Sequence, residues 1–181
     1  NWARISAAAP TGAMHRGLLE SGATQTGDAR RKIALVNSWV NGHIGFSDDR
    51  RLYQRGDYWA SAGETFAKGA GDCEDFAIAK MQLLEMAGIP RENMRLVIAR
   101  DLARSADHAV LVVTIGNDLL LLDNATDLLL DARLPNDYRP IMSYAGGRKW
   151  LHGYAPRQDR GNESLARNGG GMAVSVAALS V

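Results

Sequence analysis

The only cysteine of the 181-residue chain lies where a glycine-rich stretch meets a predicted helix. Gly69 and Gly71 precede this point, Asp72 is a residue type that often caps helix N-termini, and apolar residues then recur at helical spacing as far as Gly88. We therefore expect Cys73 at about the first position of the helix. Free backbone N–H groups and the helix dipole stabilise a thiolate there, and the thiolate is the nucleophilic form of cysteine.

Three carboxylates, those of Asp72, Glu74 and Asp75, flank this cysteine in the sequence. They argue against the common alternative in which a lone cysteine is a small buried apolar residue. The same negative charges raise the pKa of a thiol unless a cation offsets them. The cation is either an imidazolium, in a Cys–His pair, or a metal ion held by the carboxylates. The two are not exclusive.

A histidine and an aspartate are placed on a predicted hairpin where they can form a catalytic pair. His108 precedes the run AVLVVT, and Asp123 ends the run LLLLD that follows the turn. With a two-residue turn at 115–116 the two residues lie directly opposite, and with a turn at 116–117 they are diagonal neighbours on the same face. A turn with an odd residue count would favour Asn124 instead. Either residue alone also fits a structural role, as a strand-end or turn-capping group, but Cys, His and Asp together permit a triad.

Composition restricts the classes of protein to which the chain can belong. With 46% hydrophobic and 23% charged residues, it is expected to form one globular domain. A net charge of +1 gives no indication of a nucleic-acid partner. A single cysteine excludes an intramolecular disulfide, and no apolar run is long enough to span a bilayer. Because the chain opens on Asn1 and not on methionine, we expect a mature or trimmed form.

The segments before the cysteine are expected to form a scaffold and the wall of a groove. Residues 1–27 lack periodicity and are predicted to be an irregular arm. Asp28 is expected to cap a helix over residues 29–41. Residues 46–66 mix polar and aromatic side chains, which predicts a loop with short helical pieces beside the nucleophile.

The segments after the cysteine helix are predicted to be mostly strands. A strand is expected over residues 94–99, and a last hairpin over 140–144 and 148–152. Residues 1–155 would then make up the domain. Residues 156–181 have the composition of a flexible polar and glycine-rich tail with an apolar end.

Five segments of the sequence resemble the bacterial transglutaminase-like cysteine peptidases of the LapG type. The resemblance extends from about residue 33 to residue 154, and its most specific block is GDCEDFAIAK. It implies an α+β, papain-like or transglutaminase-like fold, with the nucleophile helix packed on an antiparallel sheet. The segments are Val36–Phe46, Asp57–Ser61, Gly71–Lys80, His108–Val113 and Leu120–Asn124.

The resemblance also implies roles for individual residues. The matching positions of the family form a catalytic triad, which assigns these roles to Cys73, His108 and Asp123. The acidic residues beside the cysteine bind calcium in LapG-type proteins, which makes Asp72 and Glu74 the expected calcium ligands. The implied activity is that of a calcium-dependent cysteine endopeptidase.

The resemblance further implies a biological setting. Proteins of the LapG type are periplasmic, cut a large surface adhesin at a di-alanine site in biofilm control, and are held by an inner-membrane receptor of the LapD type that senses cyclic di-GMP. The same setting is expected for this chain.

The expected groove wall departs from the family pattern. Tyr53-Gln54 stands where relatives often have Trp-Gly, and Ala62-Gly63 follows the DYWA segment where relatives have proline. These departures leave the identity of the substrate open more than the chemistry. As donors to the oxyanion of the reaction we expect the Cys73 backbone N–H and a second group from Trp59 or Gln54.

Two other functions are compatible with the same residues. An acyltransferase of the transglutaminase kind would use the same triad and pass its thioester to an amine instead of water. A non-catalytic binding module would keep the fold and use the groove to hold a partner, although an intact set of Cys, His and Asp argues against this class.

Overall fold

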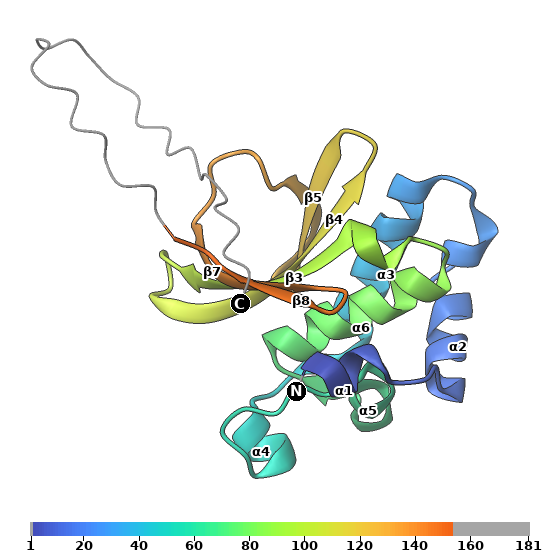
Figure 1. The fold of residues 1–181 in the computed structure, drawn as a ribbon. Coiled ribbons are helices and arrows are strands. Elements are labelled where there is room, and N and C mark those ends of the chain that lie inside the picture. The colour runs from blue at the N-terminus through green and yellow to red at the C-terminus, as the bar shows by residue number, and fades with distance from the viewer. Residues whose placement is uncertain (1, 154–181) are drawn as a thin grey trace, which may run out of the picture.

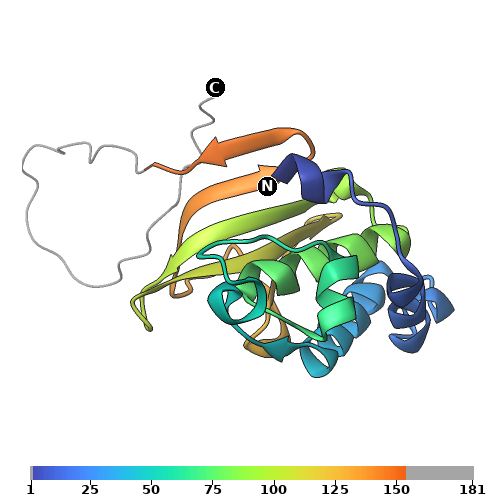
Figure 2. The same ribbon diagram turned by 90° about the horizontal axis from the view of Figure 1, so that it is seen from below.

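An antiparallel sheet with helices on one of its faces makes up the fold (Figures 1 and 2). The computed structural model describes residues 2–153, so the predicted tail at 156–181 lies outside the described residues. The helices are α1 (Trp2–Ser6), α2 (Gly12–Glu20), α3 (Ala29–His43), α4 (Asp49–Tyr53), α5 (Ala62–Lys68) and α6 (Cys73–Met86), with 3-10 turns at Ala23–Gln25 and Arg91–Asn93. The strands are β1 (Gly45–Phe46), β2 (Ala70–Gly71), β3 (Met94–Asp101), β4 (Ala106–Ile115), β5 (Asp118–Asp123), β6 (Thr126–Asp131), β7 (Tyr138–Ala145) and β8 (Arg148–Leu151).

The sheet has six strands in the order β6-β5-β4-β3-β7-β8, and β1 and β2 form a separate short parallel pair. Helix α6 is buried from Asp75 to Leu84 and packs on β4, so it is the central helix of the domain. Leucine side chains from β3, β4 and β5 (Leu96, Leu111 and Leu122) point into this core. The opposite face of the sheet carries a smaller apolar cluster around Val97, Val110 and Leu121.

Helix α3 begins as the sequence predicts. The Asp28 side chain accepts a hydrogen bond from the Arg31 backbone N–H at 2.7 Å, and the helix continues to His43, two residues beyond its expected end. His43 bonds the Trp39 carbonyl at 2.8 Å through Nδ1, which is the helix-terminal role expected for a histidine at this position. The mixed segment after α3 contains the short helices α4 and α5, in agreement with the prediction of a loop with helical pieces.

The prediction of an irregular arm over residues 1–27 is wrong. This region contains α1, α2 and a 3-10 turn, and its side chains Ile5, Met14 and Leu18 are buried in the main core. Short helices interrupted by glycine give little periodic signal, and these are stabilised by packing on distant elements. Gly17 illustrates this, because a Cβ atom there would lie 2.6 Å from the Trp39 ring.

The central hairpin has the second of the two predicted registers. Ile115 pairs with Asp118 across a turn at Gly116 and Asn117, which makes His108 and Asp123 diagonal neighbours on one face. The final hairpin β7–β8 is also present where the sequence predicts it. Strand β6 was not predicted, because its run TDLLLD reads as a continuation of the apolar strand before it. Among residues 2–153, no helix has the length and apolarity needed to cross a membrane.

Candidate active site

A buried pair of side chains joins His108 on β4 to Asp123 at the end of β5. His108 Nε2 lies 2.8 Å from Asp123 Oδ1, and both residues are more than nine-tenths buried. The Tyr138 hydroxyl donates to the other carboxylate oxygen, and its ring lies 5.3 Å from the His108 ring. Burial alone would raise the pKa of Asp123, but the hydrogen bonds from His108 and Tyr138 outweigh it and hold that pKa below its usual range. An ionised Asp123 only accepts, so the proton lies on His108 Nε2 and leaves Nδ1 for proton exchange.

The backbone at Asp123 is held from the helical layer. Lys80 of α6 donates to the Asp123 carbonyl at 2.8 Å, and Asn41 of α3 donates to the same oxygen at 3.0 Å. Asn41 also donates to the Thr126 carbonyl at 3.0 Å, across the β5–β6 turn. Lys80 is 1% exposed, and burial lowers its pKa to about 7 although Asp123 and Asp127 act in the opposite direction. The backbone of Asp123 is therefore held in place by side chains of α6 and α3.

Cys73 is the first residue of α6, as predicted. Its thiol donates to Glu74 Oε2 at 2.9 Å, and the backbone N–H of Ala109, the neighbour of His108 on β4, acts to lower the pKa of this thiol. Burial raises the pKa of the thiol, and the charges of Glu74 and Asp72 raise it further. Within residues 2–153 no hydrogen bond joins Cys73 to His108. These surroundings therefore favour the protonated thiol in the absence of a cation.

Three aspartates converge at the start of α6, beside Cys73. One carboxylate oxygen each from Asp49, Asp72 and Asp75 lies within 4.8 Å of the other two. Asp49 accepts a hydrogen bond from the Tyr58 backbone N–H, and Asp75 accepts one from the Ala60 N–H at 2.7 Å. Each aspartate keeps one buried oxygen without a hydrogen-bond partner in the described part of the chain, namely Oδ1 of Asp49, Oδ1 of Asp72 and Oδ2 of Asp75.

The electrostatics of this acidic cluster (Asp49, Asp72 and Asp75) favour the binding of a cation. Burial and then the neighbouring carboxylates raise the pKa of Asp72 to about 9, and burial chiefly raises that of Asp75 to about 7. Calcium binds carboxylate oxygens at about 2.3–2.6 Å, so two ligands of one ion lie at most about 5 Å apart. The spacing and the unpartnered buried oxygens fit a hard divalent cation such as calcium.

The cluster differs from the predicted ligand set in two respects. Asp72 belongs to it, but Glu74 bonds the Cys73 thiol and is not among the three converging residues. Asp72 also makes no side-chain cap bond to α6, contrary to the prediction, although it occupies the N-cap position. Asp49 was missed as a ligand, because only the return of α4 toward α6 brings it to Asp72 and Asp75. Its sole sequence signal is an acidic pair in the segment that was read as the groove wall.

The two predicted oxyanion residues lie in different surroundings. Trp59 is 8% exposed and packs edge-on against Tyr144, with ring centroids 5.0 Å apart. Gln54 is exposed at the end of α4, with a left-handed backbone (φ 56°). In the described part of the chain neither side chain is hydrogen-bonded to Cys73, so their predicted role stays a prediction.

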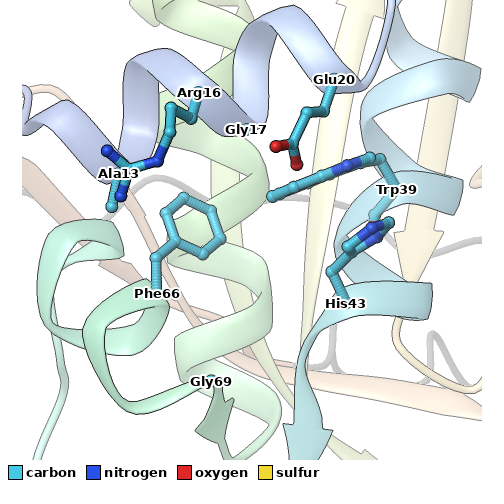
Figure 3. A pocket seen from close by; sticks show the side chains of 8 residues that line it. All are labelled: Ala13, Arg16, Gly17, Glu20, Trp39, His43, Phe66 and Gly69. Atoms are coloured by element: carbon cyan, nitrogen blue, oxygen red, sulfur yellow. The ribbon is translucent and has the colours of Figure 1, made fainter.

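A surface cavity of about 200 Å³ lies elsewhere, between α2, α3 and α5 (Figure 3). The Trp39 ring extends into it from α3, stacked on His43 at 4.4 Å and edge-on to Phe66 at 5.5 Å. Arg16 and Glu20 border it from α2. None of its lining residues belongs to the candidate active site.

Solved structures of known proteins share this architecture. Legionella pneumophila LapG matches with a TM-score of 0.64 and 28% identity, over 78% of this chain and 81% of that chain. The calcium-bound form of Legionella pneumophila LapG matches with a TM-score of 0.65 and 28% identity, over 87% of each chain. A putative cysteine protease from Cytophaga hutchinsonii, with 18% identity and a TM-score of 0.53 over 72% of this chain and 42% of that chain, shows likeness of fold alone.

The family assignment rests on most of the chain. Among curated protein sequences there is no significant match. The family model for the bacterial transglutaminase-like cysteine proteinases matches residues 9–152, which include the whole candidate site. The α+β arrangement of a nucleophile helix on an antiparallel sheet is the papain-like, transglutaminase-like fold that the sequence predicts. The chain belongs to the bacterial transglutaminase-like cysteine proteinase family, and it is a cysteine peptidase.

Proposed function

We propose that this protein is a calcium-dependent cysteine endopeptidase with Cys73, His108 and Asp123 as its catalytic triad. The observation that carries the proposal is the buried 2.8 Å His108–Asp123 contact beside α6, the helix that begins at Cys73 and packs on β4. A buried carboxylate that orients an imidazole beside a helix-terminal cysteine is the arrangement that generates a reactive thiolate.

The reaction follows from the positions of these groups. His108, oriented by Asp123, takes the thiol proton at Nδ1, and the Cys73 thiolate attacks the carbonyl carbon of the scissile peptide. The Cys73 backbone N–H at the start of α6 stabilises the oxyanion, with Trp59 or Gln54 as the predicted second donor. His108 then protonates the leaving amine, and water hydrolyses the thioester to regenerate the thiol. The approach of Cys73 to His108 requires the thiol to leave Glu74.

Calcium is proposed to bind at Asp49, Asp72 and Asp75, next to the nucleophile. The three unpartnered buried oxygens support this, as does the calcium-bound form of the Legionella LapG structure. Glu74, which the resemblance makes a ligand, follows Cys73 in the chain and accepts a hydrogen bond from its thiol. We propose that Glu74 gives up this hydrogen bond when it binds calcium. Bound calcium supplies positive charge that offsets the carboxylates and lowers the thiol pKa.

The biological setting is proposed from the family. We infer that the substrate is a large surface adhesin cut at a di-alanine site, that cleavage controls biofilm attachment, and that the enzyme works in the periplasm. An inner-membrane receptor of the LapD type is the proposed regulatory partner. The 28% identity to Legionella LapG over most of both chains supports these proposals.

Cleavage of a di-alanine-containing adhesin fragment tests the proposed function. We expect the purified protein to cut the fragment in calcium, to stop when a chelator is added, and to recover when calcium is restored. Cys73→Ala should fold and show no turnover. Product masses with an added amine separate hydrolysis from acyl transfer, since only a transferase yields the amide. Cleavage by Cys73→Ala would refute the nucleophile, and undiminished cleavage in chelator would refute the metal requirement.

A further inference from the structure

One backbone segment determines how far apart two carboxylates of the acidic cluster lie. This segment, residues 58–62, leads from the loop after α4 into the first residue of α5 and is called the clamp segment below. Its Tyr58 N–H donates to Asp49, and its Ala60 N–H donates to Asp75 at 2.7 Å. These bonds hold one oxygen of each carboxylate, while the other oxygen is buried without a hydrogen-bond partner among residues 2–153. A shift of the clamp segment therefore moves both carboxylates.

The clamp segment is held on its other side by Arg4 of α1. Arg4 Nη2 donates to the Trp59 carbonyl, which lies between the two amides that hold the carboxylates. Arg4 Nη1 also bonds both carboxylate oxygens of Glu64, at 3.1 and 2.9 Å. Glu64 in turn accepts the Ser61 N–H at 2.7 Å and closes the capping box of α5. Arg4 thus fixes the middle of the clamp segment directly and its end through Glu64.

Helix α1 is docked independently of this arginine. Ile5 is fully buried, and its carbonyl accepts from Gln82 at 2.9 Å. Gln82 accepts the Ala62 N–H at 2.8 Å, and Trp2 donates to the Gly146 carbonyl in the β7–β8 turn at 2.7 Å. In Figures 1 and 2, α1 accordingly lies beside α5 and the β7–β8 hairpin. Removing the guanidinium therefore tests its own contacts, since the remaining contacts keep the helix in place.

We propose that Arg4 is a positioning residue for the calcium site, which it sets through the carbonyl of Trp59 and the carboxylate of Glu64. The inference rests on the proposed function, because it needs calcium at the acidic cluster. Helix α1 lies outside residues 9–152, the part of the chain that the family model matches. The Arg4 side chain is 46% exposed, so its ion pair with Glu64 adds little to stability by itself. Its effect is on the geometry of the metal ligands.

Calcium titration of the whole chain tests this inference. Arg4→Gln should raise the calcium dissociation constant by about tenfold, the lower end of the 10–100-fold range for loss of an outer-shell support at metal sites. Arg4→Lys keeps one donor group and should have an intermediate constant. The matched control is Arg30→Gln, which breaks the comparably exposed Arg30–Asp118 pair on α3 and β5 and should bind calcium within about twofold of wild type.

The measurements are calorimetric dissociation constants, together with melting temperatures in chelator. A purely structural role for Arg4 would lower the calcium-free melting temperature and leave the calcium constant unchanged, and that result would overturn the inference. Wild-type protein that binds no calcium would overturn both the proposed metal requirement and this inference. Wild-type binding with an unchanged Arg4→Gln constant would overturn the inference alone.

Discussion

Lys80 provides a quantitative test of the contacts that hold Asp123 in place. Burial lowers the pKa of Lys80 to about 7, whereas a lysine in an unfolded chain titrates near 10.4. Between these values the unfolded chain binds one proton more than the folded chain. The free energy of unfolding contributed by this group therefore rises with pH, by about 1.4 kcal/mol per unit.

Replacing Lys80 by methionine removes this contribution and keeps the length of the side chain. The stability advantage of wild type over Lys80→Met should grow by about 2.5 kcal/mol between pH 7.5 and pH 9.5, since about one proton is linked over two units. A constant offset from the lost bond to the Asp123 carbonyl adds to this difference but does not change its slope.

Urea unfolding at pH 7.5, 8.5 and 9.5 measures this slope, with chelator present so that the acidic cluster titrates alike in both proteins. The control is Lys32→Met, which removes a half-buried lysine that donates to the Ala87 carbonyl at 2.8 Å. The control corrects for loss of a lysine-to-carbonyl bond. A difference between wild type and Lys80→Met that stays constant with pH would refute the assigned environment of Lys80.

The remaining predictions concern the His108–Asp123 pair and the proposed calcium site. Tyr138→Phe removes a hydrogen bond to the Asp123 carboxylate and should lower kcat/KM about tenfold, as expected for a bond of roughly 1.5 kcal/mol to a charged group; a change within twofold would contradict this role. Calcium should raise the melting temperature more at pH 8 than at pH 6, because protons compete for carboxylates with raised pKa values; equal increases at both pH values would contradict the cluster electrostatics. Gly71→Ala places a Cβ atom 2.5 Å from the Asp75 Cβ, and this substitution should cost about 1–3 kcal/mol of stability and weaken calcium binding. The control is Gly42→Ala, whose Cβ would meet no atom of another element within 4 Å among residues 2–153, and it should be neutral or stabilising in the same unfolding and titration assays.

Local signals were sufficient to predict the elements that carry the proposed triad. Glycine and acidic residues before an apolar helical pattern placed Cys73 at the first helical position, where the structure has it. Strand parity placed His108 and Asp123 on one face for either two-residue turn, and the observed register brings them into contact. Both inferences depend on residues close in sequence, so they needed no knowledge of the tertiary structure.

The features that the sequence did not predict depend on contacts between distant segments. Asp49 comes near Asp75 where α4 returns toward α6, and the clamp segment binds both carboxylates there through backbone N–H groups, which carry no side-chain signature. Helices α1 and α2 are stabilised by burial against other elements more than by their own propensity. Asp72 has an N-cap residue type, but its carboxylate lies in the acidic cluster instead of capping α6.

The alkylation rate of Cys73 between pH 5 and pH 9 tests the central claim most directly. The chain has a single cysteine, so every iodoacetamide adduct reports the proposed nucleophile. In calcium, wild type should react rapidly at pH 6, well below the ordinary thiol pKa of about 8.5, whereas His108→Ala should react more than tenfold more slowly. Chelator should slow wild type as well, since the carboxylates then raise the thiol pKa. Identical pH profiles for wild type and His108→Ala in calcium would contradict a thiolate generated by the His108–Asp123 pair.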